Sequence, residues 1–391
     1  MQVEQLYEEA LGLLKGLIST PSLSREEQGT AALIRRFLGE RGVEVNQQLN
    51  NVWAVNKFYS PGKPTVVLNS HHDTVKPNPQ YTKNPFEPII EDGKLYGLGS
   101  NDAGGPLVAL IACFLHFYKQ EKLPINLVLA ATAEEEISGV NGVEALLKDP
   151  DFLQKTGQLV LTDQTMPTQT THQALAFDGW SAIVGEPTEM ELAVAEKGLL
   201  VLDCTVTGKT GHAARQEGIN ALYKAMDAIN WFRNYQFPKI SPTLGPVHMN
   251  VTVIQTENKA HNVVPGTCQF TVDIRVTDAY THEEIVDIVK ANVDAEIKPR
   301  SLRMRATAIG DTHPLVQAGI GLGKQTYGSP TCSDKALLPF PALKCGPGFS
   351  GRSHSADEFI YLHEINEGIT TYIQLLQQAM ALYQSTKSNQ A

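Results

Sequence analysis

The sequence predicts an α/β fold into which a smaller α+β unit is inserted. Three apolar, β-branched runs, Thr65–Leu68, Ile125–Thr132 and Ser181–Val184, alternate with helical patterns in the first half of the chain. Short runs of this kind, bounded by turn residues, are typical of buried strands. From Leu199 onward the expected strands alternate in polarity or run β-branched, and the βα style returns only near the C-terminus. These two changes indicate an inserted domain.

Two helices are expected before the first of these strands. Apolar residues repeat at helical spacing over Val3–Ile18, and Pro21 stops the pattern. Ser24 and Glu27 have the spacing of a capping box. They predict a second helix that ends at Gly42, because glycine commonly follows the last helical turn.

The rest of the first half is predicted from turn and helix signals. Asp92-Gly93 lies between apolar residues and predicts a hairpin turn. Residues 151–177 are rich in Gln and Thr and lack periodicity, which predicts a long surface excursion. The further elements expected here are strands at Val43–Leu49 and Asn51–Phe58, and helices at Leu107–Tyr118 and Val140–Leu147.

The inserted unit is expected to have about 110 residues, an ordinary size for a domain. The predicted boundaries give one domain made of residues 1–197 and 308–391, and an inserted domain of residues 198–307. The elements expected from here to the C-terminus are strands at Val201–Val206, Met249–Ile254, Gln269–Val276 and Leu302–Ala308, and helices at Ile219–Ile229, Glu283–Val293 and Glu364–Leu382.

Composition limits the classes of partner. The 391 residues carry 32 basic and 42 acidic side chains, a net charge of −10 without a basic run, so nucleic acid is not an expected partner. No apolar run reaches membrane-spanning length, and the N-terminus lacks the plan of a signal peptide. Five cysteines lie far apart without a C-x-x-C pair, which favours a reducing compartment. We therefore expect a cytoplasmic protein without membrane contact.

Residues with chemical function follow the predicted strands where the strands end. They are His71 and Asp73 after the first strand, Glu135 and Glu136 after the second, and Glu186 after the third. Because side chains alternate along a strand, His71 and Asp73 point to one side. A metal-binding histidine needs its second ring nitrogen tied to a carboxylate or carbonyl. Open α/β sheets bind ligands at the carboxyl ends of their strands, so we expect these residues to converge.

Two further residues extend this set. Asp102 lies in the glycine-rich stretch Gly97–Gly105, and His354 follows a glycine turn near the C-terminus. Two histidines and several carboxylates at one sheet edge would repel strongly without a cation, and their mixture suits zinc, manganese or cobalt. One carboxylate can bridge two ions roughly 3.5–4 Å apart. Glu134 is expected to be a solvated loop acid.

Taken together, these motifs resemble the dinuclear-zinc aminoacylase, carboxypeptidase and deacylase family. The resemblance covers nearly the whole chain. It rests on H-x-D, the glycine-flanked Asp, T-A-x-E-E, G-E-P-T and G-x-x-x-H-x-x-x-D/E. It implies an α/β catalytic domain, with a mixed sheet and helices on both faces, and an inserted α+β lid and dimerisation domain. It also implies two divalent metal ions, Zn²⁺ or Co²⁺, and a homodimer formed through the insert.

The resemblance assigns roles position by position. It implies that His71, Asp102 and Glu186 bind one metal ion. It implies that Asp102, Glu136 and His354 bind the other, so that Asp102 is the bridge. It further implies that the peptide after Asp102 is cis.

Catalytic roles are implied in the same way. Asp73 would orient His71, and Glu135 would be the general base. In the insert, His212 of G-K-T-G-H-A-A and Asn262 of H-N-V-V-P-G match residues that stabilise an oxyanion, His212 in the active site of the partner subunit. We expect the functional role for both; the alternative is that they are turn residues.

Two arginines are candidates for binding the substrate. Arg275 could contact a substrate carboxylate or be a solvated strand residue. Arg352, together with Lys335, could recognise the acyl group or the side chain of the substrate through its positive charge.

The function that these residues indicate is hydrolysis of the amide of an N-acyl amino acid, a small-molecule substrate. The strings around His71, Asp102 and Ser333 resemble the acetylornithine and acetylcitrulline deacetylase branch, which implies arginine biosynthesis. An aminopeptidase or dipeptidase and a desuccinylase remain alternatives, because all need the same metal centre. A metal-free binding protein on the same scaffold is the alternative of another class.

Overall fold

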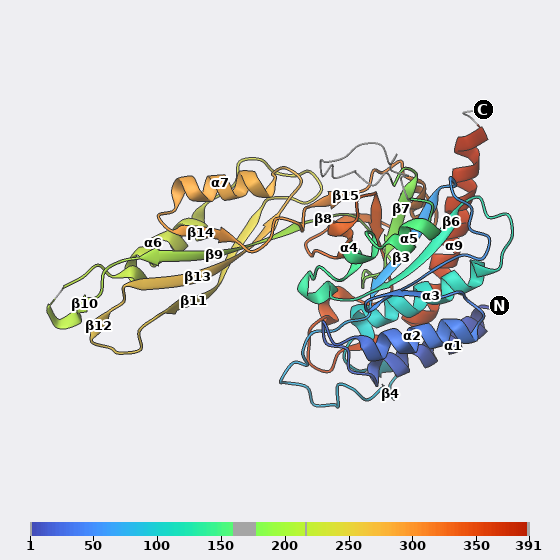
Figure 1. The fold of residues 1–391 in the computed structure, drawn as a ribbon, viewed down its shortest axis with the longest axis horizontal. Helices are drawn as coiled ribbons and strands as arrows, with labels where there is room; N and C mark the ends of the chain where they lie inside the picture. The colour runs from blue at the N-terminus through green and yellow to red at the C-terminus, as the bar shows by residue number, and fades with distance from the viewer. Residues whose placement is uncertain (1, 159–176, 216, 389–391) are drawn as a thin grey trace, which may run out of the picture. The chain divides into compact units, whose positions relative to one another are not determined.

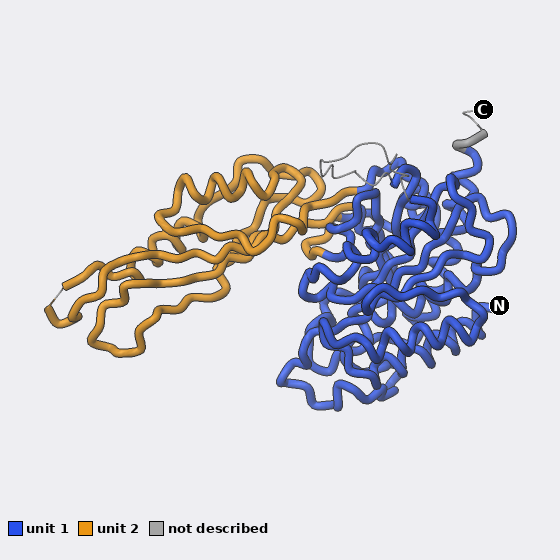
Figure 2. The backbone as a smooth tube through the Cα atoms, in the orientation of Figure 1, with its two compact units in different colours: residues 1–194, 309–327, 333–391 blue, residues 195–308, 328–332 orange. Residues whose placement is uncertain are grey.

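The computed structural model describes residues 2–158, 177–215 and 217–388, and the chain forms two compact units (Figures 1 and 2). The first unit comprises residues 1–194, 309–327 and 333–391, and the second comprises residues 195–308 and 328–332. The expected insert, residues 198–307, lies within the second unit. In the described part of the chain, no helix has the length and hydropathy of a membrane span.

The first unit is built on a mixed sheet, and the α/β fold predicted from the sequence is confirmed. The strand order of the sheet is β1-β2-β6-β3-β7-β17-β8-β15, and β16 pairs with β8; β15 and the last residues of β8 and β16 fall in the second unit. Neighbours among β6, β3, β7 and β17 are parallel, whereas β2 and β8 run antiparallel to their neighbours. The strands are β1 (Asn46–Gln48), β2 (Asn51–Val55), β3 (Thr65–His71), β6 (Asn126–Thr132), β7 (Trp180–Val184), β8 (Leu192–Glu196), β15 (Thr307–Ala308), β16 (Thr326–Ser329) and β17 (Ala342–Lys344).

Helices cover both faces of this sheet, as Figure 1 shows. Val66 and Leu68 of β3 belong to an apolar core shared with α1, α2, α3, α8 and α9, whereas Val67 points to a second core with α4 and α5. This alternation is the period-2 pattern of a strand buried on both faces. The helices are α1 (Val3–Ile18), α2 (Gln28–Glu40), α3 (Gly105–Tyr118), α4 (Val143–Leu146), α5 (Pro150–Lys155), α8 (Pro314–Gly321) and α9 (Leu362–Ser388).

The first unit also contains a small three-stranded sheet, in which the strand order is β18-β5-β4. Its strands are β4 (Ile89–Glu91), β5 (Lys94–Tyr96) and β18 (Phe359–Tyr361). The hairpin predicted at Asp92-Gly93 is confirmed, and both residues have positive φ, 50° and 73°. Positive φ at both central positions is the mark of a type I′ turn, which explains the Asp-Gly pair.

The capping box predicted at Ser24 and Glu27 is wrong. Helix α2 begins at Gln28 and has no side-chain cap. The Ser24 hydroxyl instead donates to the Asp73 carboxylate at 2.7 Å, and the Glu27 carboxylate accepts from the backbone N–H of Glu134 at 3.2 Å. Glu27 also accepts from the N–H of Arg25 at 2.6 Å, but the reciprocal bonds of a capping box between Ser24 and Glu27 are not formed.

Two other expectations need correction. Within residues 151–177, α5 extends to Lys155, and Phe152 packs edge-on against Trp53 with ring centroids 5.0 Å apart. Residues 159–176 of the expected excursion lie outside the described residues. The strand expected at Leu302–Ala308 is limited to β15, and the fourth strand of the insert is instead β14 (Glu296–Pro299).

The second unit is an antiparallel sheet of order β11-β13-β9-β14 with two helices on one face. Along β9 buried and part-buried residues alternate, because one sheet face packs on the helices and the other does not. The elements are β9 (Gly198–Thr207), β10 (Gly211–His212), α6 (Ala221–Asn234), β11 (His248–Thr256), β12 (Val263–Val264), β13 (Thr267–Val276), α7 (His282–Asn292) and β14.

Candidate metal centre

The predicted site residues meet at one edge of the main sheet. The strands β6, β3 and β7 are neighbours and run parallel, so their carboxyl ends lie at the same edge. His71 is the last residue of β3, Glu135 and Glu136 follow β6, and Glu186 follows β7. The convergence expected from the sequence is therefore a direct consequence of the strand order.

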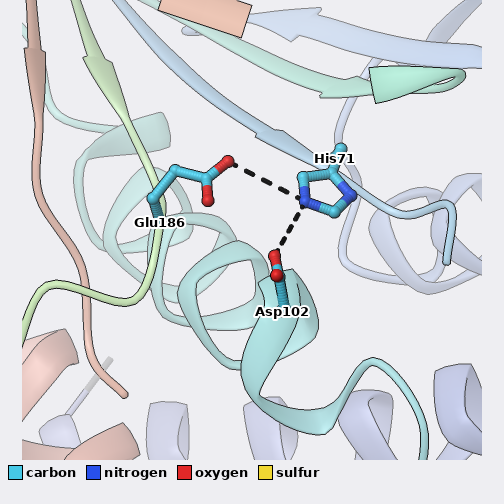
Figure 3. Close-up of side chains that lie close together, drawn as sticks. All are labelled: His71, Asp102 and Glu186. Atoms are coloured by element: carbon cyan, nitrogen blue, oxygen red, sulfur yellow. Dashed lines mark hydrogen bonds and ion pairs between the residues drawn. The ribbon is translucent and has the colours of Figure 1, made fainter. Parts of the chain in front are cut away.

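His71, Asp102 and Glu186 form a first set of donors (Figure 3). One ligand atom of each lies within 4.8 Å of the others. His71 Nε2 is 3.2 Å from Asp102 Oδ1 and 3.8 Å from Glu186 Oε1. Figure 3 shows both carboxylates turned towards the same ring nitrogen, which is the arrangement that a shared cation needs.

Asp102, Glu136 and His354 form a second set with the same 4.8 Å limit. His354 Nε2 is 3.0 Å from Glu136 Oε2 and 3.7 Å from Asp102 Oδ2. Asp102 thus offers one carboxylate oxygen to each set. Glu136 Oε1 is buried and has no hydrogen-bond partner, so it is an oxygen left for a ligand.

Asp73 ties the first set to the backbone of the neighbouring strand end. It is fully buried, its main-chain oxygen lies 3.0 Å from His71 Nδ1, and its Oδ1 lies 3.4 Å from the same nitrogen. Its carboxylate also accepts from the backbone N–H groups of Glu135 and Glu136, at 3.1 and 3.2 Å. Asp73 therefore orients His71 chiefly through its main-chain oxygen, while its carboxylate fixes the course of the segment that carries both glutamates.

The loop that carries Asp102 has little room for side chains. The peptide between Asp102 and Ala103 is cis, as the family resemblance implied. Gly99 has a φ of 74°, and a Cβ on Gly104 would approach the carbonyl oxygen of Gly99 to 2.4 Å. Glycine at these two positions lets the backbone pass close to itself at the start of α3.

The electrostatics of the cluster favour a bound cation. Burial raises the pKa of Glu135 well above its ordinary value, and burial next to Asp102 raises the pKa of Glu186 to about 8. Two carboxylates 4.8 Å apart repel by about 3.5 kcal/mol at an effective dielectric constant of 20. Two divalent cations would remove this repulsion, and the mixture of imidazole and carboxylate donors fits them.

Several buried polar residues around the cluster were missed from the sequence. Asp334 is buried, and its Oδ2 accepts from Thr132 Oγ1 at 2.7 Å and from Asn69 Nδ2 at 3.3 Å. Burial raises the pKa of Asp334 to about 6. Glu358 is also buried and bonds to the loop of Asp102. Only the S-D-K and H-x-x-x-D/E strings could have pointed to these two acids, and neither string says what they contact.

Glu134 and His72 are structural. The expectation of a solvated Glu134 is wrong, because it is 5% exposed and its carboxylate accepts from Asn141 Nδ2 at 2.8 Å. His72 points away from the cluster, as expected from strand alternation. Its ring nitrogens lie 2.9 Å from Thr30 Oγ1 and 2.9 Å from the Asn50 carbonyl.

His212 and Asn262 lie together in the second unit. The strand β10 pairs with β12, and the N–H of Ala213 donates to the carbonyl of Asn262 at 3.0 Å. His212 is exposed, and its Nδ1 accepts from the N–H of Ala214. Their oxyanion role stays a prediction.

Both candidate substrate arginines already have a carboxylate partner. Arg275 donates to both oxygens of Asp273, at 2.8 and 3.1 Å. Arg352 donates to both oxygens of Glu364, at 2.7 and 3.0 Å, and its guanidinium lies 4.8 Å from the ring centroid of Phe359. Lys335 is buried and donates to the carbonyl of Val194 at 3.0 Å. A substrate role for the arginines stays a prediction.

Comparison with known proteins gives a consistent result. The model of peptidase family M20/M25/M40 matches residues 67–378. Succinyl-diaminopimelate desuccinylase 2 of Ruegeria sp. (strain TM1040) is 26% identical over 393 residues, 93% of either chain. A succinyl-diaminopimelate desuccinylase of Xanthomonas oryzae pv. oryzae (strain PXO99A) is 24% identical over 398 residues, 95% of this chain and 99% of that protein.

Solved structures share the fold. An M20 family metallo-carboxypeptidase from Sulfolobus solfataricus matches with a TM-score of 0.71 and 16% identity over 95% of this chain and 99% of that one. A dinuclear metal binding peptidase of the M20 family from Bacillus subtilis matches with a TM-score of 0.65 and 15% identity, over 97% and 99%. At these identities the match supports the fold alone.

Substitution of the shared donor should affect both ion sites. We expect the wild-type protein to bind two equivalents of Zn²⁺ or Co²⁺ and Asp102→Ala to lose both, because Asp102 belongs to both donor sets. Glu186→Ala is the matched control, since it removes a donor from the first set only. Isothermal titration with Co²⁺ measures both stoichiometries. A protein with Asp102→Ala that still binds two equivalents tightly would contradict the shared role.

Proposed function

This chain belongs to peptidase family M20/M25/M40, and from that membership we propose that it hydrolyses the amide bond of an N-acyl amino acid with two divalent metal ions. The observation that carries the proposal is the pair of three-residue donor sets that share Asp102. His71 and Glu186 complete one set, and Glu136 and His354 complete the other. Zn²⁺ suits the mixture of imidazole and carboxylate donors, and Co²⁺ is the second candidate.

When bound, such ions lower the pKa of a coordinated water from about 15.7 to about 7 and polarise the amide carbonyl. The protein supplies a proton acceptor beside them. Glu135 Oε2 lies 3.9 Å from His71 Nε2, next to the first donor set but outside both. Because burial raises the pKa of Glu135, its carboxylate holds a proton readily. We assign it the transfer of a proton from the attacking water to the departing amine.

The acyl group is proposed to be succinyl. The sequence favoured acetyl and a place in arginine biosynthesis, but the curated relatives described above are named succinyl-diaminopimelate desuccinylases. Those names support an N-succinyl amino acid over N-acetylornithine or N-acetylcitrulline. The peptidase alternative rests on the same metal centre, and the carboxypeptidase structure described above adds no support for a substrate, because at 16% identity it informs the fold only.

A homodimer through the second unit is part of the proposal. The surface of this unit presents large apolar side chains on α6 and on the strand β11. They are Tyr223 and Met226 on the helix, Val253 and Ile254 on the strand, and Ile219 before the helix, each 47–66% exposed. Exposed large apolar side chains are more frequent at protein interfaces than elsewhere on a surface, and this supports the proposal. We also propose a cytoplasmic location, which the five cysteines support because none forms a disulfide.

A substrate panel tests the acyl preference. The metal-loaded protein should release free amine from N-succinyl amino acids faster than from N-acetyl amino acids or dipeptides, measured as kcat/KM for each. N-succinyl-diaminopimelate and N-acetylornithine are the reference substrates. Faster turnover of N-acetylornithine would restore the deacetylase hypothesis, and turnover of dipeptides alone would favour the peptidase.

The general base is tested by Glu135→Gln. Removal of the proton acceptor should lower kcat by roughly 10²–10⁴, the usual contribution of positioned proton transfer. Two equivalents of metal should remain bound, because Glu135 belongs to neither donor set. Metal content by atomic emission and kcat on the best substrate are measured on one preparation. Near-normal turnover with both ions bound would exclude Glu135 as the base.

Mixing two inactive variants tests His212. If His212 acts in the active site of the partner subunit, a mixed dimer of Glu135→Gln and His212→Ala has one intact site. Its other site lacks Glu135 and also lacks His212. About half of randomly mixed dimers are of this kind, so about a quarter of wild-type activity should return. Subunit exchange is followed with differently tagged chains. No recovery despite exchange would place His212 in the site of its own chain or remove it from catalysis.

A further inference from the structure

Glu358 makes an unusual set of hydrogen bonds to the loop that carries Asp102. Its Oε1 accepts from the backbone N–H groups of Asn101 and Asp102, both at 2.9 Å, and its Oε2 accepts from the N–H of Gly99 at 3.1 Å. The side chain is 2% exposed. One buried carboxylate thus accepts from three backbone N–H groups, those of Gly99, Asn101 and Asp102, within one loop.

A buried carboxylate next to Asp102 costs free energy of desolvation and repulsion, and the three backbone N–H groups that donate to it offset part of that cost. A neutral side chain in place of Glu358 would lower the electrostatic repulsion with the Asp102 carboxylate. The three backbone donors, however, would then lose a charged acceptor, and such bonds are stronger than neutral ones.

The position of Glu358 in the chain connects the two donor sets. It lies four residues after His354 and directly before β18, which pairs with β5. The preceding Asp357 accepts from the backbone N–H groups of Thr82 and Lys83, both at 2.9 Å. The segment is therefore anchored on both sides, and a displacement of Glu358 would move the loop of Asp102 relative to His354.

The loop is also held from its other side. The Asn101 side chain donates to the carbonyl of Phe349 at 3.1 Å and accepts from the N–H of Phe349 at 3.0 Å. Phe349 lies in the glycine turn that leads to His354. Contacts from Glu358 and from Phe349 thus join the loop before α3 to the C-terminal segment, and the N–H of Asp102 itself donates to Glu358.

We propose that Glu358 is a positioning residue that fixes the Asp102 loop so that one oxygen of Asp102 faces each ion site. The inference rests on the proposed function, because it assumes that Asp102 is the shared ligand. Glu358 touches neither donor set through its carboxylate and acts through the backbone of Asp102. Groups of this kind that orient a ligand typically change metal affinity or activity by 10–100-fold when they are replaced.

The test is the metal affinity of Glu358→Gln in the full chain. The protein is stripped of metal and titrated with Zn²⁺ in competition with a chelating dye. We expect both dissociation constants to rise by about 10–100-fold, because the shared ligand is displaced from both sites. Glu364→Gln is the matched control. Its carboxylate binds Arg352 and the N–H of Tyr361 in the same segment but contacts no residue of the Asp102 loop.

Thermal unfolding separates positioning from a general structural role. Ions that bind the folded state raise the unfolding temperature according to their affinity. A positioning role predicts that the rise caused by Zn²⁺ is smaller for Glu358→Gln than for Glu364→Gln. A fall of the metal-free unfolding temperature with an unchanged rise would overturn the proposal.

Other outcomes are equally decisive. If Glu358→Gln does not fold, Glu358→Asp keeps the charge but has a stem too short to reach all three donors, and wild-type affinity in that variant overturns the proposal. If the wild-type protein binds no divalent ion, the proposed function fails together with this inference. If the wild type and Glu358→Gln bind two ions equally well, the inference alone fails.

Discussion

The concentration of buried negative charge at one sheet edge is the constraint on which the rest of the structure depends. Asp102, Glu136 and Glu186 bring their oxygens within a few ångströms of two imidazoles, and Glu135 lies beside them. Each pair of carboxylates in contact costs several kcal/mol if nothing compensates it, an amount comparable to a large part of the stability of a domain. Two divalent ions would remove this cost, and metal binding would then stabilise the folded chain.

The loops at this edge are held by a second layer of acids. Asp73 accepts from the backbone of Glu135 and Glu136, Glu27 accepts from that of Glu134, and Glu358 accepts from that of the Asp102 loop. In each case a buried carboxylate binds backbone N–H groups next to a predicted ligand or base. These carboxylates fix the conformation of each loop, and the oxygens of the predicted metal ligands stay available for the ions. This arrangement also explains why so many acids lie near the cluster and yet only three belong to the donor sets.

The sequence predicted the part of this arrangement that depends on strand order. His71 ends β3, and Glu135 and Glu186 follow the ends of β6 and β7, so the parallel order of these strands brings all three residues to one edge. The second layer was not predictable in this way. Ser24 and Glu27 have the spacing of a helix cap, but they bond to Asp73 and Glu134, which are distant in the chain. Residue spacing identifies the hydrogen-bond partners that are available locally. Tertiary packing decides which partner a side chain actually bonds to.

The two donor sets differ in how they depend on the chain order. His71, Asp102 and Glu186 all precede the second unit in sequence, so the first set needs only β3, β7 and the loop before α3. The second set needs His354, which follows the insertion in sequence. Before it reaches His354, the chain re-enters the main sheet and forms β17 between β7 and β8. Contacts of such long sequence separation close large loops and therefore cost more chain entropy than local ones. Asp102 belongs to both donor sets, and its loop is held by a local bond from the N–H of Gly104 to the carbonyl of Gly99 and by the C-terminal segment through Glu358 and Phe349.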